Sequence, residues 1–148
     1  MAGFILAASV TVAAAQAGRP APVDPPAECY CEECGMYVKG EAVKFASEFI
    51  MKKGSPSFFC DLGDLFLHYE VSKKRADIAA IFVKDYNTGA WTDGKTAWYL
   101  AGSKVKTPMR YGILAFKDKA AAAAFMKKGG GKDILSFDEV LASKVYRR

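Results

Sequence analysis

The chain has 148 residues, of which 51% are hydrophobic and 25% charged, with a formal net charge of +5. These values indicate one globular domain and exclude a disordered chain; a domain of this size buries a core without disulfide cross-links. The 21 Lys and Arg residues are scattered in short pairs, a pattern that does not predict a nucleic-acid-binding groove. The mild positive charge favours acidic partners or anionic membrane surfaces.

Residues 1–17 differ from the rest of the chain because they carry no charge and are mostly apolar. They end in Ala15-Gln16-Ala17, the A-x-A pattern of a signal-peptide cleavage site. About 15 apolar residues are fewer than the ~20 that a membrane-spanning helix needs. We therefore predict a signal peptide and export. No cysteine stands at the cleavage site, so the mature protein is not expected to be a lipoprotein, and membrane contact is expected to be only indirect.

The remaining chain is predicted to hold a linker and one folded domain. Residues 18–27 are rich in proline and are expected to be an unstructured linker. The domain is expected over residues 28–148, with a short basic tail, and to consist of two pseudo-repeat halves of about 28–75 and 76–143. The halves are matched by landmarks that recur in the same order: Phe45 with Phe116, Lys53-Gly54 with Lys128-Gly129, and Phe59-Cys60-Asp61 with Ser136-Phe137-Asp138.

Short helices and strands alternate along this domain. Helices are predicted over 62–69, 118–127 and 139–143, the second because it is rich in alanine and followed by three glycines. Strands are predicted over 79–86 and 96–100, which are rich in β-forming residues. The pattern lacks the repeated long βαβ units of a parallel sheet, so it indicates an α+β fold with antiparallel strands.

A cluster of sulfur-containing residues in 29–36 carries the chemistry. Cys29, Cys31, Cys34 and Met36 lie within this segment, and Cys60 follows later. Four interpretations are open: a disulfide in an oxidising compartment, a zinc site of the four cysteines, a thiol-disulfide oxidoreductase that uses two of them, and a copper(I) site. The paired C-x-x-C motifs typical of zinc sites are absent, and so is the strand-to-helix setting of a thioredoxin-like motif.

Copper(I) fits the cluster because soft thiolate and thioether ligands select this ion. On an extended segment, Cys34 and Met36 would point to the same side. The pseudo-repeat nominates Met109 as a third ligand, because it begins the second half as Met36 begins the first. His68 is the single histidine, which excludes a multi-histidine centre; we expect it to be structural. Asp61 and Asp64 are expected to be helix N-caps.

The sequence resembles the NosL family, the accessory proteins of nitrous oxide reductase maturation. The resemblance covers about residues 29–142 and rests on ordered motifs: the C-x-x-C-G-M of Cys31–Met36, the Thr107-Pro108-Met109 triplet, Ala115-Phe116, Gly129-Gly130, and the run Ser136-Phe137-Asp138-Glu139-Val140. It implies two related ββαβ halves around an antiparallel sheet, similar to the organomercurial lyase fold.

The resemblance also implies a function. The protein would be a periplasmic copper(I) metallochaperone and not an enzyme, with Cys34, Met36 and Met109 as ligands and Cys31 as a transient ligand. Its partner would be a copper-accepting apo-enzyme or an ABC-type maturation complex, and the protein would act as a monomer or weak dimer. The alternatives are an exported thiol-disulfide redox protein and a structural zinc module of four cysteines.

Overall fold

The computed structural model describes residue 18 and residues 20–147. The predicted signal peptide lies outside the described residues. Within that part of the chain, no helix is long and apolar enough to cross a membrane. The elements, in chain order, are η1 (Gly40–Phe45), β1 (Ser47–Met51), β2 (Ser57–Phe59), α1 (Leu62–Val71), η2 (Arg75–Asp77), β3 (Ile78–Lys84), β4 (Trp91–Asp93), β5 (Trp98–Ala101), β6 (Leu114–Phe116), α2 (Lys119–Gly129), β7 (Asp133–Leu135) and α3 (Phe137–Ser143).

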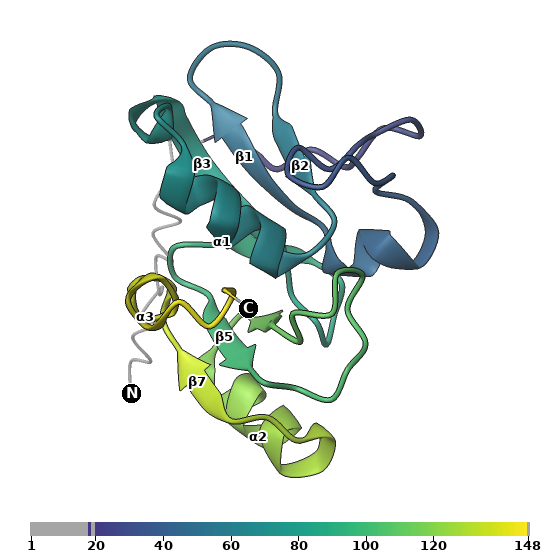
Figure 1. The fold of residues 1–148 in the computed structure, drawn as a ribbon, viewed down its shortest axis with the longest axis vertical. Coiled ribbons are helices and arrows are strands. Elements are labelled where there is room, and N and C mark those ends of the chain that lie inside the picture. Colours follow the sequence, from purple (N-terminus) through teal and green to yellow (C-terminus); the bar gives the residue numbers. More distant parts are fainter. Residues whose placement is uncertain (1–17, 19, 148) are drawn as a thin grey trace, which may run out of the picture.

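The strands form two antiparallel sheets, and both follow one plan (Figure 1). The first sheet has the order β2-β1-β3-β4 and the second the order β6-β5-β7. In each, a hairpin leads into a helix, and the strand after the helix pairs with the other edge of the first strand. The units β1-β2-α1-β3 and β5-β6-α2-β7 are therefore two ββαβ repeats, which confirms the α+β class and the two-halves plan.

The register of the repeat differs from the one expected from the sequence landmarks. The first sheet takes β3 and β4 from beyond residue 76, so the sheets divide between Asp93 and Trp98. Topology matches β2 with β6, so Phe59-Cys60-Asp61 corresponds to Phe116-Lys117-Asp118 and not to the predicted 136–138. The predicted match with 136–138 is wrong because Asp118 and Ser136 both cap a helix that follows a strand. The two places therefore have similar local sequences.

Side-chain caps fix where the helices begin. Asp61 and Asp118 accept hydrogen bonds from the backbone N–H groups of Gly63 and Ala121, as N-cap residues do. At α3 the cap is Ser136, which forms a capping box with Glu139. Three strand-to-helix junctions are thus set by short polar residues, and of these the sequence predicts the Asp61 cap.

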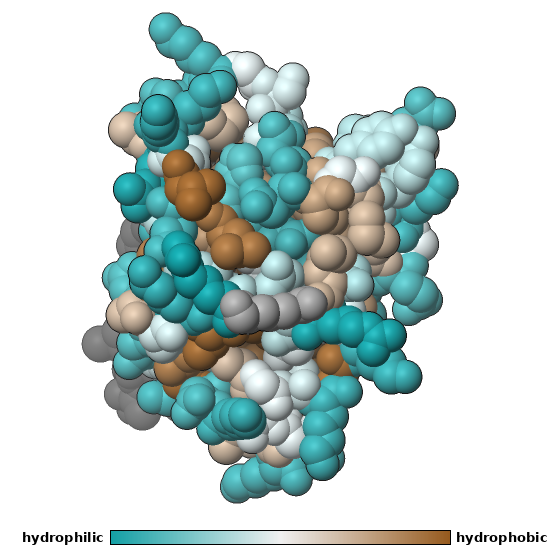
Figure 2. All heavy atoms as spheres, in the orientation of Figure 1, coloured by the Kyte–Doolittle hydropathy of each residue, from teal (hydrophilic) through white to brown (hydrophobic). Residues whose placement is uncertain are grey.

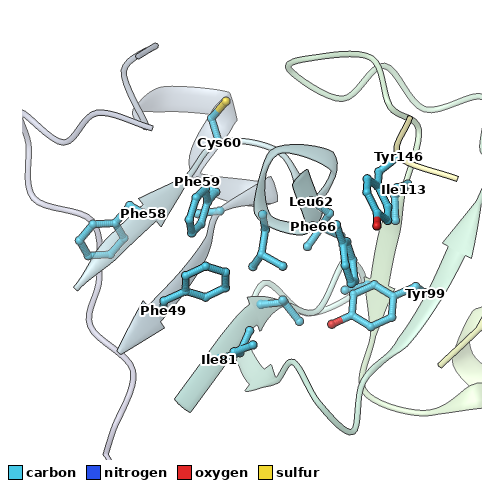
Figure 3. Packing of buried hydrophobic residues seen from close by; sticks show 14 of the residues in the cluster. Phe49, Phe58, Phe59, Cys60, Leu62, Phe66, Ile81, Tyr99, Ile113 and Tyr146 are labelled. Carbon is cyan, nitrogen blue, oxygen red and sulfur yellow. The ribbon is translucent and has the colours of Figure 1, made fainter. Parts of the chain in front are cut away.

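The core lies where α1 packs between the two halves (Figure 3). Phe66 of α1 contacts Tyr99 of the second sheet, Phe137 of α3 and Tyr146 near the C-terminus, with ring centroids 5.0–5.6 Å apart. On its other side, Phe49 and Phe59 of the first sheet pack at 4.7 Å. This shared core holds the first helix and its N-terminus in a fixed place.

The proline-rich residues 20–27 contact the first sheet, although the sequence predicts an unstructured linker there. The backbone N–H of Val23 donates to the carboxylate of Glu48 on β1, and Asp24 accepts from Lys84 and Trp91. Glu48 is fully buried, and its second carboxylate oxygen has no partner within the described residues. Burial raises the pKa of Glu48 to about 7, so the segment is held against the sheet by a carboxyl group that favours its neutral form.

Candidate metal centre

A tight loop formed by residues 29–38 carries the first two cysteines of the site. The backbone N–H of Val38 donates to the carbonyl of Cys29, and the N–H of Cys31 donates to the carbonyl of Met36. Gly35 closes the loop with a φ of +72° and donates its N–H to the carbonyl of Cys31. Glycine adopts this left-handed conformation without steric cost. The segment is therefore a turn, and the expected extended Cys34-Gly35-Met36 arrangement is wrong.

The loop is attached to the edge of the first sheet. Cys31 forms a parallel bridge with Phe58 of β2, and the N–H of Glu32 donates to the Phe58 carbonyl over 2.8 Å. These bonds place the loop beside the end of β2, where Cys60 stands immediately before α1. In Figure 3 the Cys60 sulfur points away from the rings of Phe49 and Phe59. Cys60 is therefore part of the buried core, and its sulfur is turned toward the junction.

Asp61 and Asp64 fill different roles at this junction. Asp61 is the N-cap of α1, and its other oxygen accepts the backbone N–H of Met109 over 2.8 Å. Asp64 lies in the first turn of the helix, four residues after Cys60, and side chains at this spacing share one face of a helix. The prediction that Asp64 is a cap is therefore wrong: its carboxylate faces the cysteines.

Three sulfur atoms and one carboxylate oxygen converge at this place. The sulfurs of Cys31, Cys34 and Cys60 and an oxygen of Asp64 all lie within 4.8 Å of one another. The Cys34 and Cys60 sulfurs are 3.5 Å apart, and the thiols of Cys31 and Cys60 lie 3.3 and 3.4 Å from the Asp64 oxygen. Cys34 is half-buried and the other three groups are buried. The cluster is therefore compact and opens toward solvent on the Cys34 side.

The electrostatics of the cluster favour one thiolate among protonated neighbours. A hydrogen bond from the Cys60 thiol lowers the pKa of Cys31 to about 5. The same contact raises the pKa of Cys60, and burial raises the pKa of Cys34 to about 12. Burial also raises the pKa of Asp64 to about 6. Near neutral pH the cluster therefore offers one ready thiolate, and two further thiols that lose protons when a metal binds.

The structure brings together only part of the predicted ligand set. Cys31 and Cys34 lie in the cluster, but the Met36 side chain is 50% exposed. Met109 is half-buried against the core and is tied by its backbone to Asp61, next to Cys60. Met109 lies in the β5–β6 loop and Met36 before η1, so the two methionines do not hold equivalent places in the repeat. Their role as ligands stays a prediction.

Cys29 does not join the other three cysteines. All four cysteines are free thiols, and the Cys29 thiol contacts the carbonyl of Tyr30 at 3.8 Å. Asp64 takes the fourth place in the cluster, so the geometry does not bring together the four-cysteine zinc site that the sequence left open.

His68 connects the loop to the helix. Its Nδ1 lies 3.0 Å from a carboxylate oxygen of Glu33, which stands between the two cysteines of the loop. The imidazole also packs at 5.3 Å from the Phe59 ring. This agrees with the structural role expected for the single histidine: it ties the loop down one turn beyond Asp64.

Sequence reasoning left two members of the cluster without a role. The sequence pattern places Cys60 only in the four-cysteine alternative and predicts Asp64 as a helix cap. The signal that could have found them is the spacing Cys60-x-x-x-Asp64 at the start of a predicted helix, directly after a strand. Sequence alone does not show that residues 29–38 fold back onto this strand end.

The fold and the cluster define a class: a two-repeat α+β protein with three cysteines and an aspartate at a strand-to-helix junction, arranged so that they could hold a metal ion. The NosL family model matches residues 22–145, and the chain belongs to the NosL family. The crystal structure of the copper chaperone NosL from Shewanella denitrificans superposes with a TM-score of 0.70 at 24% identity, covering 84% of this chain and 98% of that one. This likeness shows a shared fold. No curated protein matches the chain significantly.

Proposed function

We propose that this protein carries copper(I), held by the sulfurs of Cys31, Cys34 and Cys60. The observation that carries the proposal is the convergence of three sulfurs within 4.8 Å at a partly open site. Copper(I) prefers soft sulfur ligands and accepts low coordination numbers. Membership of the NosL family and the fold shared with a copper chaperone support the same conclusion.

The arrangement suits a carrier because the metal would be held firmly and still be reachable. Cys31 supplies a thiolate at neutral pH, and Cys34, on the open side, is the sulfur from which an incoming ligand would displace the metal. The Asp64 carboxylate accepts a hydrogen bond from the Cys60 thiol. Because Cys34 and Cys60 must lose protons on loading, the affinity for copper(I) should fall as pH falls.

The expected place and partner of this carrier follow from the family resemblance. The protein would be exported to the periplasm and supply copper for the maturation of nitrous oxide reductase, through a copper-accepting apo-enzyme or an ABC-type complex. Met36 and Met109 would serve as additional or transient ligands during this transfer. Met36 is exposed enough to meet an incoming partner.

Metal titration of the anaerobic, reduced protein tests the proposal. Residues 18–148 would be titrated with copper(I) against a chromophoric competitor, with zinc in parallel. We expect one tightly bound copper(I) per chain. Binding of zinc but no tight binding of copper(I) would refute the copper function.

Zinc is the second candidate because the cluster offers a fourth, oxygen ligand. Three thiolates and the Asp64 carboxylate could complete a tetrahedral zinc site. Structural zinc sites supply folding free energy, so this alternative predicts that chelation would unfold the protein. The copper carrier, in contrast, should keep its thermal unfolding transition without metal, because the shared aromatic core does not depend on the cluster.

A further inference from the structure

A basic groove begins at the outer edge of the metal-binding loop. It has a volume of about 850 Å³, and its walls are the β1–β2 loop and the turn after α1. Lys52 and Lys53 line one wall, and Lys73 and Lys74 line the other. These residues lie far apart from Cys31 and Cys34 in the chain, but the fold sets the groove and the metal cluster side by side.

Two contacts join the groove to the metal-binding loop. Glu32, which follows Cys31, lines the groove and bonds to β2 through its backbone. His68 also lines the groove and holds Glu33, the next residue of the loop. A chain segment lying in the groove would therefore contact the loop that carries two of the three sulfurs.

The charge of the groove is unbalanced. Four lysines line it, against two acidic side chains, Glu32 and Asp77. Within the described residues, no ion pair neutralises Lys53, Lys73 or Lys74, and the ammonium group of Lys52 donates to the carbonyl of Ala76. Uncompensated charges of one sign along a concave surface attract a partner of the opposite sign and speed its association.

The floor of the groove adds an apolar component. Phe49, Met51, Val71 and Ile78 contribute to its lining, and Val71 is 66% exposed. A small apolar patch among hydrophilic side chains lies over α1 (Figure 2). A concave surface lined by lysines and apolar side chains fits a chain segment better than it fits a flat lipid surface.

We propose that this groove binds an acidic segment, containing apolar side chains, of the protein that receives the copper. The inference rests on the proposed copper function and extends it, because it names the chemistry of the partner. Docking there would hold the acceptor beside Cys34, so that its own ligands can displace the sulfurs one at a time. The lysines would act as positioning residues without touching the metal.

Fluorescence anisotropy with a defined probe tests the groove. The probe is a fluorescein-labelled peptide of alternating glutamate and leucine, and the control peptide replaces each glutamate with lysine. The protein is residues 18–148, with and without copper(I). We expect the acidic peptide to bind, the basic one to fail, and the affinity to fall as salt is raised.

Two matched double variants locate the binding. Lys53→Gln with Lys74→Gln removes one charge from each wall, and Lys127→Gln with Lys128→Gln removes two charges from the end of α2, outside the groove. The first should weaken peptide binding about tenfold and the second should leave it near the wild-type value. Both should bind copper(I) as the wild type does, which separates docking from metal binding.

The outcomes separate the two proposals. Equal weakening by both double variants, or no peptide binding by a protein that binds copper(I), would overturn the groove and leave the copper function intact. Peptide binding without copper binding would overturn the copper function and the identity of the partner, and would leave only the groove's preference for acidic segments. Stronger binding to phosphatidylglycerol vesicles than to the peptide, lost in the Lys53/Lys74 variant, would show a membrane surface instead and overturn the acidic-segment proposal.

Discussion

The two ββαβ repeats build the same junction and use it differently. In the first repeat, β2 ends before Cys60, Asp61 caps α1, and Asp64 faces the cysteines. In the second, β6 ends before Lys117, Asp118 caps α2, and Ala121 stands where Asp64 stands in the first. The cap is common to both, so it belongs to the fold. The cysteine and the second carboxylate are particular to the first repeat, so they belong to the site.

The first repeat also has a neighbour that the second lacks. Residues 29–38 precede β1 and return to the end of β2, where they deliver Cys31 and Cys34. The proposed metal centre therefore combines two features: a cysteine and a carboxylate at a repeated junction, and an added loop fixed beside it. Each of the following predictions tests one of these features.

Removal of a cluster sulfur should have the largest effect. Cys34→Ser and Cys60→Ser should each lower copper(I) affinity by at least about 100-fold, because a direct ligand matters more than its supporting groups. Competition titration measures the change. Cys29→Ser is the matched control and should keep the wild-type affinity, since Cys29 lies outside the cluster. A large loss of copper(I) affinity in Cys29→Ser would mean that the ligands are assigned wrongly.

The two helix caps should differ in their contribution to stability. Asp118→Ala removes an exposed cap and should cost about 1 kcal/mol in free energy of unfolding. Asp61→Ala should cost about 3 kcal/mol, because its buried carboxylate also accepts the N–H of Met109 and leaves that donor unpaired. Urea denaturation of both variants measures the difference. Equal costs would show that the bond between the repeats adds nothing.

The buried Glu48 should make stability depend on pH. Its pKa rises from 4.5 to about 7 on folding, so the folded state binds this proton more tightly. The stabilisation from this group is complete below about pH 4.5 and is lost as the pH rises through about 7. Glu48→Gln should therefore be about 3 kcal/mol more stable than the wild type near pH 8 and nearly equal near pH 4. A difference that does not vary with pH would contradict this account.

Grafting the residues of the first junction onto the second should have the smallest effect on metal binding. Lys117→Cys with Ala121→Asp copies Cys60 and Asp64 into the second repeat, but no loop supplies further sulfurs there. Copper(I) stoichiometry should stay at one per chain. A second tight copper would show that the junction alone suffices and that residues 29–38 are not required.

The sequence predicts local features well and long-range contacts poorly. Helix α2 and the Asp61 cap of α1 follow from short runs of residues, and so does the proximity of Cys31 and Cys34. The approach of Cys60 to Cys31 and Cys34 depends on the backbone hydrogen bond from Glu32 to Phe58. No local sequence pattern predicts this contact. The sequence predicts the two repeats but matches residues 59–61 with 136–138 instead of 116–118. The reason is that every junction between a strand and a capped helix has a similar local sequence.

The most direct test of the central claim is the X-ray absorption spectrum of the copper(I)-loaded protein, recorded for the wild type and for Cys60→Ser. We predict a first coordination shell of sulfur in the wild type, with one sulfur fewer or no bound copper in the variant. A shell dominated by nitrogen or oxygen, or a sulfur count unchanged by Cys60→Ser, would contradict the assignment of the metal centre to the β2–α1 junction.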